Sequence, residues 1–437
     1  MVISVHPSEK YGVGGYSNSG QFGQIMRYIN DDGSWYIGKM DETFGWENRY
    51  LLWTKVGDTR GTGSTNEFGD LLDDHHILML HTRRYGDYDG DSRSDILFHF
   101  TGDTNWFLGR IEGVTPTNPL GSLKWHLVDR TYPRFGNLYD GRHLIVFDKW
   151  HPGHNGILFY YVNDGNWHLG EIISPQNLQL RWSKVGNTHT FGNILTSTHL
   201  IIAGSFIEHN VGSLLMYYEG SGNWHLGWIE GSTLGTSVIK WHHVVHNWFG
   251  NLRDGNHLNM KGYFGGNSKD DILFYNATDG NWWFGWIEGW GTSSSTPFIM
   301  KWKNVGNTGV PGFGRLTDGY HLNVSGDFDG DSRDEILMYS SSDGDWWLIK
   351  INGNSFSTYI LSAQKIGNTK GTTGNLADPF HDVVSSDILR GNGAPGRVEL
   401  LAIRYPYFVV TRKVWHITVP YYWNPPQLEI KELPETF

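Results

Sequence analysis

The sequence contains no cysteine among its 437 residues. A disulfide framework, a zinc site built on thiolates and a cysteine nucleophile are therefore excluded. Any metal ion in this protein has to be held by oxygen or imidazole ligands.

Long apolar runs and an excess of basic residues are missing as well. No apolar stretch is long enough to cross a bilayer, and MVISVHPSEK at the amino terminus lacks the basic and apolar regions of a signal peptide. With 34 Lys and Arg against 45 Asp and Glu, the formal net charge is −11. Nucleic-acid binding needs a basic face, so we expect no nucleic-acid partner. We also expect a soluble chain without membrane insertion.

Glycine and aromatic residues are abundant instead, with 57 Gly, 21 Trp, 22 Tyr and 22 Phe. Short β-branched or aromatic runs such as DILFHF and EILMYS recur between turns rich in Gly, Asn and Asp. No long stretch shows the 3.6-residue period of an amphipathic helix. The sequence therefore predicts an all-β protein.

One strand–turn–strand phrase recurs along the chain. It reads DILFHFTGDTNWFLG from residue 95, DILFYNATDGNWWFG from 271 and EILMYSSSDGDWWLI from 335, and a worn copy, VELLAIRYPYFVVTRKV, begins at 398. Each copy has a further strand on either side, so the unit is four strands. Its tryptophans recur about every 60 residues; they are Trp35, Trp106, Trp167, Trp224, Trp282 and Trp346.

Four-stranded units repeated around an axis form a β-propeller. Seven copies predict a seven-bladed β-propeller of four-stranded blades over residues 1–420, followed by a C-terminal surface tail at 421–437. Contact between the first and last blades should close the ring. The repeated tryptophans are expected to pack between blades, because a large aromatic at a fixed point of every sheet buries much apolar area.

Two copies of the repeat carry an acidic loop. The spacing D-x-D-x-D-x-x-x-E or -D aims alternate oxygens, together with a backbone carbonyl, at one hard cation. The sequence therefore predicts two calcium sites, which we interpret as structural because the other blades have lost the pattern. The expected ligands are Asp87, Asp89, Asp91, the carbonyl at Arg93 and Asp95 in the second copy, and Asp327, Asp329, Asp331, the carbonyl at Arg333 and Glu335 in the sixth.

This pattern resembles the FG-GAP or VCBS-type repeat propellers, whose units carry a DxDxDG calcium loop before a D-[IL]-L strand. The resemblance spans nearly the whole chain and implies a propeller fold and structural calcium. Such propellers include lectins, adhesins and integrin-like heads, so a fold resemblance alone assigns no activity. Calcium of this kind is filled at extracellular concentrations, which predicts an extracellular or secreted protein.

A histidine recurs at the start of the innermost strand of each unit. By analogy with WD-repeat propellers, His321 is expected to bond Asp343 and Trp346, which would tie neighbouring strands together. A group repeated once per blade is usually architectural, so a ring of metal-binding histidines is the less favoured interpretation.

Residues that vary within the repeat are the candidates for ligand binding. Trp228 and Trp286 lie in GWIEG, and WHHVVHNWF contributes His242, His246 and Trp248. Flat aromatic rings flanked by short polar groups suit neutral sugars. The leading hypothesis is therefore a carbohydrate-binding, lectin-like propeller whose partners are glycans or polysaccharides.

Two alternatives stay open. A polysaccharide lyase or glycoside hydrolase would place its site at the channel mouth, with a lyase using groups such as His242, His246, Arg84 and Tyr85. A protein-binding or adhesion platform would use the broad end face of the ring. No catalytic residue can be assigned, and the oligomeric state is not predicted.

Overall fold

The computed structural model describes most of the repeat. The described residues are 9–14, 24–41, 50–59, 68–72, 76–80, 87–130, 138, 141–151, 154–172, 178–188, 191–208, 211–267, 269–289, 298–309, 313–318, 320–329, 331–354, 357–369, 381–386, 399–404, 413–418, 429–433 and 435–436.

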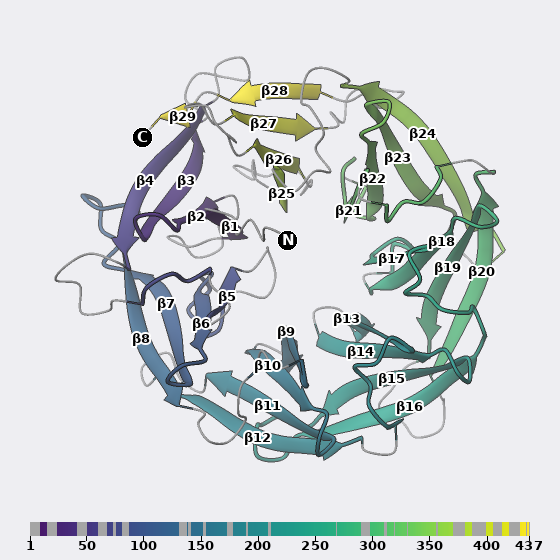
Figure 1. The fold of residues 1–437 in the computed structure, drawn as a ribbon, viewed down its shortest axis with the longest axis horizontal. Coiled ribbons are helices and arrows are strands. Elements are labelled where there is room, and N and C mark those ends of the chain that lie inside the picture. Colours follow the sequence, from purple (N-terminus) through teal and green to yellow (C-terminus); the bar gives the residue numbers. More distant parts are fainter. Residues whose placement is uncertain are drawn as a thin grey trace, which may run out of the picture.

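The described strands form seven sheets arranged in a ring, and each sheet is called a blade here (Figure 1). Blades 1 to 3 consist of β1 (Glu9–Gly14), β2 (Gln24–Ile29), β3 (Ser34–Asp41), β4 (Tyr50–Asp58); β5 (His76–Leu80), β6 (Ile96–Phe100), β7 (Asn105–Glu112), β8 (Ser122–Arg130); and β9 (His143–His151), β10 (His154–Tyr161), β11 (Asn166–Ile172), β12 (Leu180–Asn187).

Blades 4 to 7 follow in the same order. They consist of β13 (His199–Glu208), β14 (Val211–Tyr218), β15 (Asn223–Glu230), β16 (Val238–His246); β17 (His257–Gly262), β18 (Asp271–Asn276), β19 (Asn281–Glu288), β20 (Ile299–Asn307); β21 (His321–Gly326), β22 (Glu335–Ser340), β23 (Asp345–Asn352), β24 (Ile360–Asn368); and β25 (His381–Ser386), β26 (Glu399–Arg404), β27 (Lys413–Thr418), β28 (Glu429–Leu433). In every blade the first strand lies nearest the axis and the fourth lies at the rim (Figure 1).

The prediction of seven four-stranded blades is wrong in its strand count. Six sheets have four strands, whereas the sheet of blade 1 has five, in the order β1-β2-β3-β4-β29. The strand β29 (Glu435–Thr436) pairs in parallel with Leu51 and Leu52 of β4. An open strand edge can accept a further strand, and β29 reaches this edge because it directly follows blade 7.

The segment predicted as a surface tail also contributes to the ring. Glu429–Leu433 forms β28, which pairs with β27 in register from Val414↔Leu433 to Thr418↔Glu429. Without β28 the last sheet would have three strands and β27 would have an open edge, so this segment pairs as a strand.

Within the described residues, no helix is long and apolar enough to span a bilayer.

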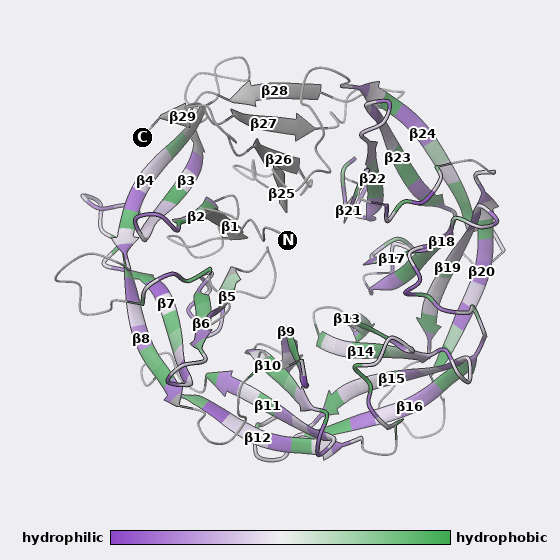
Figure 2. Ribbon diagram, in the orientation of Figure 1, coloured by the Kyte–Doolittle hydropathy of each residue, from purple (hydrophilic) through white to green (hydrophobic). Residues whose placement is uncertain are grey.

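Hydrophobic and hydrophilic residues alternate along the rim strands β8, β12, β16 and β20 (Figure 2). The second strands carry continuous apolar runs instead, and all but the last residue of β18 is buried. A strand covered on both faces reads as such a run, whereas a strand with one wet face alternates. The core therefore lies between neighbouring blades.

The six repeated tryptophans are fully buried, which confirms their predicted place in the core. Each lies on the third strand of its blade, and four of them contact an indole of the next blade. The ring centroids are 5.6 Å apart for Trp35–Trp125, 5.9 Å for Trp106–Trp182, 5.8 Å for Trp167–Trp241 and 5.1 Å for Trp224–Trp302. These indole pairs bind one blade to the next.

The indole nitrogen of the repeated tryptophan is bonded by threonine, not by histidine. Trp346 Nε1 donates to Thr369 Oγ1 at 3.0 Å, and blades 1, 3 and 5 repeat the bond. His321 instead bonds Asp318 through Nδ1 at 2.9 Å. The expected tie of His321 to Asp343 and Trp346 is therefore wrong, because Asp318 lies only three residues before the histidine, on the adjoining turn.

We expect Trp167→Ala to lower the free energy of unfolding by about 3–5 kcal/mol, because it removes a fully buried indole and its contact with Trp241. Trp248→Ala is the matched control, since Trp248 is 67% exposed. Urea unfolding followed by circular dichroism measures both. Equal losses in the two variants would contradict the packing role of the repeated tryptophan.

Candidate functional site

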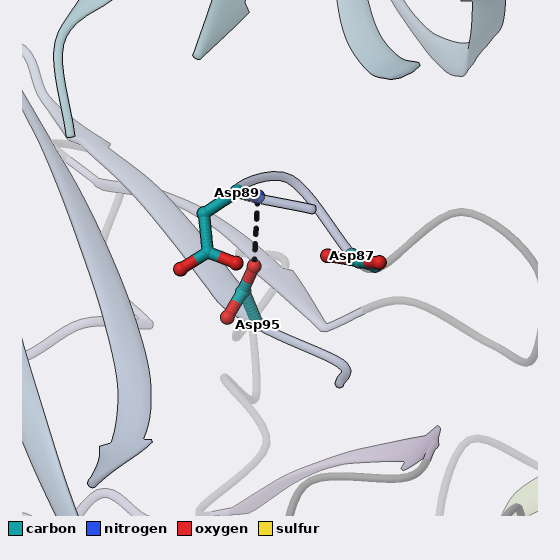
Figure 3. A group of neighbouring side chains, drawn as sticks. All are labelled: Asp87, Asp89 and Asp95. Atoms are coloured by element: carbon teal, nitrogen blue, oxygen red, sulfur yellow. Dashed lines mark hydrogen bonds between the residues drawn. The ribbon is translucent and has the colours of Figure 1, made fainter. Parts of the chain in front are cut away.

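The acidic loop of blade 2 brings three of its carboxylates together. Oxygens of Asp87, Asp89 and Asp95 all lie within 4.8 Å of one another (Figure 3). Asp95 Oδ2 accepts the backbone N–H of Tyr88 at 2.9 Å and that of Asp89 at 3.4 Å. The loop thus wraps around a buried carboxylate at the start of the second strand.

The acidic loop of blade 6 repeats this geometry. Asp327, Asp329 and Glu335 form the second such group among the described residues. Glu335 Oε2 accepts the N–H of Phe328 at 2.9 Å, as Asp95 does for Tyr88. The two loops are therefore equivalent in structure as well as in spacing.

The other predicted ligands serve the turn itself. Asp91 Oδ1 accepts the N–H of Arg93 at 2.8 Å, and Asp331 Oδ1 accepts that of Arg333 at 2.9 Å. The Arg333 guanidinium donates to the carbonyl of Gly353 at 2.6 Å, which fastens the loop to the end of β23. Asp91 and Asp331 thus lie beside the carboxylate groups and shape the loops.

A basic side chain from the third strand reaches into each acidic loop. Arg110 Nη1 lies 2.6 Å from Asp89 Oδ2, and Lys350 Nζ binds Asp329. Lys350 also lies 3.6 Å from Glu335 Oε1. The spacing of the acidic residues does not predict these ion pairs, although Arg110 and Lys350 lie at equivalent positions of the repeat.

In blade 3 the acidic residue lies on the third strand, and a histidine takes the equivalent position at the loop. Glu171 stands at the third-strand position, and its Oε1 lies 2.6 Å from His151 Nδ1 at the loop position. Both side chains are buried. In blades 2 and 6 the acidic loop thus faces a cation from the third strand, and in blade 3 a histidine faces a carboxylate.

Burial raises the pKa of Asp95 and of Glu335, the carboxylic acids that the two loops surround. The pKa of Asp95 lies well above its usual range, because the side chain is desolvated and faces Asp89. For Glu335 the same cause, desolvation first and the charge of Asp329 second, raises the pKa to about 9. These groups favour a proton or a cation beside them.

Blades 4 and 5 keep the hydrogen bond but lose the charge cluster. Asp271 Oδ2 accepts the N–H of Gly265 at 2.8 Å, and in blade 4 Ser213 Oγ accepts the N–H of Phe206 at 3.0 Å. A polar side chain near the start of the second strand therefore holds the preceding loop in each case. Blades 4 and 5 share this hydrogen bond with blades 2 and 6.

An exposed tryptophan lies at the end of blade 4. Trp248 is 67% exposed, and its Nε1 donates to the carbonyl of Glu219 at 3.1 Å. Beside it, Asn223 Oδ1 lies 3.1 Å from His243 Nε2 and 3.2 Å from His246 Nδ1. The edge of the Trp248 indole is thus held by the β14–β15 turn, while much of the side chain is exposed to solvent.

Trp248 with its neighbours His246 and Asn223 is called the Trp248 platform below. The remaining predicted ligand residues lie apart from it. Trp228 and His242 both contact Phe298, with ring centroids 5.3 Å and 6.4 Å away. Trp286 is 7% exposed and packs on Phe284 and Tyr359. The structure therefore brings Trp248 and His246 together and separates them from the two GWIEG tryptophans. Arg84 and Tyr85 lie outside the described residues.

No protein family and no curated protein matches the chain by sequence. Solved structures do match in fold. A lectin of Agrocybe aegerita, described as recognising non-reducing terminal N-acetylglucosamine, superposes with a TM-score of 0.63 at 12% identity, over 98% of this chain and 96% of that chain.

Two further matches are weaker. A putative 6-phosphogluconolactonase from Bacteroides uniformis gives a TM-score of 0.37 at 10% identity, over 82% of this chain and 96% of that one. Hsv2 from Kluyveromyces lactis gives 0.33 at 10% identity, over 97% and 98%. The repeat, the ring of sheets and the lectin superposition together define the chain as a β-propeller protein.

The buried Asp148 provides a pH test of the blade 3 loop. Desolvation raises its pKa from 3.8 to about 6 in the folded protein. Between these pH values the folded state binds more protons than the unfolded state, so stability falls as the pH rises from about 4 to about 6.

We therefore expect the free energy of unfolding of wild type to fall by about 2 kcal/mol between pH 4.5 and pH 7.5 relative to that of Asp148→Asn, because the asparagine does not titrate. Asparagine keeps the acceptor for the Lys149 N–H, which Asp148 Oδ1 binds at 2.7 Å. Denaturant unfolding across this pH range measures the effect. Parallel stability curves for the two proteins would show that Asp148 does not titrate this way.

Proposed function

We propose that this protein is a carbohydrate-binding, lectin-like propeller with structural calcium loops. The observation that carries the proposal is Trp248, an exposed indole whose edge is held by the carbonyl of Glu219. Its polar neighbours His246 and Asn223 stand at the same turn.

The chemistry of this platform suits a pyranose. A sugar ring offers apolar C–H groups on one face, which pack on an aromatic ring, and hydroxyls on its edge, which need donors and acceptors. An indole that is already fixed loses little conformational freedom when it binds a ligand. Imidazole and amide groups beside it supply both donors and acceptors.

The Agrocybe aegerita lectin supports the choice of first probes. Its similarity at 12% identity concerns the fold, and its description names non-reducing terminal N-acetylglucosamine. Glycans that end in this sugar are therefore the first to test against the present chain.

The test is a glycan array on the calcium-loaded protein, which we expect to show binding to defined glycans. Trp248→Ala should weaken binding to the best glycan by about tenfold or more, because the stacking face is lost. Tyr320→Ala is the matched control, since Tyr320 is another exposed aromatic, at 60%, on a different blade. Equal affinities for wild type and Trp248→Ala would contradict the platform.

The same samples test the enzymatic alternative. A polysaccharide panel assayed for new reducing ends and for unsaturated uronates should stay intact with a lectin. Cleavage would instead make the protein a hydrolase or a lyase. Capture of proteins with no response to any glycan would favour the adhesion platform.

The acidic loops are proposed as structural calcium sites of the FG-GAP or VCBS type. Their ligands are hard carboxylate oxygens, and Asp95 Oδ1 is buried without a hydrogen-bond partner among the described residues. A bound calcium ion would neutralise Asp87, Asp89 and Asp95 and would fasten the loop to the second strand. Such sites fill at extracellular calcium, so we propose an extracellular location.

Calcium should raise the melting temperature, and chelation should lower it, because the ion binds only the folded loop. At about 100-fold excess over the dissociation constant the gain is about 2.7 kcal/mol. Asp87→Asn with Asp327→Asn should reduce this gain, whereas Asp103→Asn, which changes an exposed turn aspartate, should keep it. Differential scanning calorimetry with calcium and with chelator decides the question; identical melts would reject structural calcium.

A further inference from the structure

The rim strands of blades 1 to 5 carry a second tryptophan that lies on a glycine. A β-carbon at Gly285 would come within 2.3 Å of Trp302 Cζ3, and the other four glycines are equally close to their indoles. The register pairs are Gly38↔Trp53, Gly109↔Trp125, Gly170↔Trp182, Gly227↔Trp241 and Gly285↔Trp302.

Blade 6 has lost this indole. The equivalent register pair is Ile349↔Ala363. In blade 5, Trp302 packs on Phe249 at 5.0 Å and on Trp224 of blade 4 at 5.1 Å. Ala363 is too small to fill the corresponding space between blades 5 and 6.

A second aromatic is lost at the end of the second strand. In blades 2, 3 and 4 it stacks on the histidine of the first strand, with ring centroids 4.7 Å apart for His76–Phe100 and 4.6 Å for both His143–Tyr161 and His199–Tyr218. The equivalent residue in blade 6 is Ser340, which pairs with His321 in the register. One face of this site is therefore lined by a hydroxyl instead of a ring.

These two losses open a cavity of about 490 Å³ in blade 6. Its apolar side is formed by Phe313, Met338, Trp347 and Ala363. Phe313 meets Trp347 edge to face, with centroids 5.3 Å apart. Volumes of this size are typical of sites that enclose a small molecule.

Polar residues complete the lining of the cavity. They include His321, Ser340, Ser342 and Asp343, and Ser340 Oγ lies 3.0 Å from Ser342 Oγ. His321 uses Nδ1 to bond Asp318, which leaves Nε2 as the nitrogen that can meet a ligand. A lining that combines two aromatic rings with hydroxyl, imidazole and carboxylate groups suits a polyhydroxylated ring.

We propose that this cavity of blade 6 is a second binding site, which encloses a single pyranose ring. Its choice of a sugar rests on the proposed function, but the site is separate from the Trp248 platform. The ring packs on Phe313 and Trp347, and its hydroxyls meet His321, Ser342 and Asp343.

The test introduces into blade 6 the glycine–tryptophan pair that blades 1 to 5 contain. Ile349→Gly combined with Ala363→Trp should fill the cavity with an indole. Blades 1 to 5 already contain this pair of a glycine and a tryptophan at the same register position. Ala363→Ser is the matched control that keeps the volume. Ser340→Tyr is an independent variant, which restores the aromatic that stacks on the histidine in blades 3 and 4 and so narrows the cavity from its polar side.

Each variant is titrated by calorimetry with N-acetylglucosamine, with glucose and with galactose, and its melting temperature is checked. We expect at least one sugar to bind wild type and Ala363→Ser alike. Both filled variants should weaken that binding by about tenfold or more at an unchanged or higher melting temperature.

The results separate this site from the platform. Binding that survives in both filled variants but is lost in Trp248→Ala overturns the cavity proposal and leaves the lectin proposal standing. Binding that is lost in the filled variants and kept in Trp248→Ala supports the cavity and rejects the platform. No binding of any of the three sugars to wild type overturns the enclosed pyranose, while the glycan array still judges the lectin proposal.

Discussion

The contact between indole rings of neighbouring blades is the interaction on which this ring depends. A third-strand tryptophan of one blade meets a rim-strand tryptophan of the next at four successive junctions, from Trp35–Trp125 to Trp224–Trp302. Large rigid rings exclude water and fix the angle between sheets, because they bury much area with few rotatable bonds. Glycine on the third strand is the necessary counterpart, since any side chain there would collide with the indole. At the junction of blades 5 and 6 the rim tryptophan is replaced by Ala363, and a cavity appears there.

Ionisable side chains also pair within single blades, between the loop before the second strand and the third strand. The acidic loops of blades 2 and 6 face Arg110 and Lys350, whereas the His151 loop faces Glu171. Each of these loops thus has a partner on its own third strand, and blades 4 and 5 keep the hydrogen bond from the loop backbone to a side chain near the start of the second strand. A divalent ion in the acidic loops would share its carboxylates with a side-chain cation, so the two loops are less negative than their aspartate count indicates.

The repeat made the all-β class, the ring of sheets and the buried tryptophans predictable, because period and composition are visible in the sequence. Partners within a blade were harder to assign. The bond from Trp346 to Thr369 was missed, since spacing alone does not tell which of several polar groups lies nearest. The carboxylate groups were found, but not the cations from β7 and β23 that meet them. The cavity had a signal in the sequence: ILSAQKIGNT carries alanine where IMKWKNVGNT carries tryptophan. Only the cross-strand register shows that this change removes an interblade contact.

The pairing of β29 with β4 has a consequence for the order of folding. Contacts between consecutive blades join segments that lie close in the chain, whereas Glu435 and Leu51 are brought together from opposite ends of it. Closing so long a loop is entropically costly and slow, and chains fold from the N-terminal side as they leave the ribosome. Blades 1 to 6 can therefore stack in succession during synthesis, while blade 1 keeps one face and the edge of β4 exposed to other proteins. The edge of β4 is covered only after β29 has been synthesised and has paired with it.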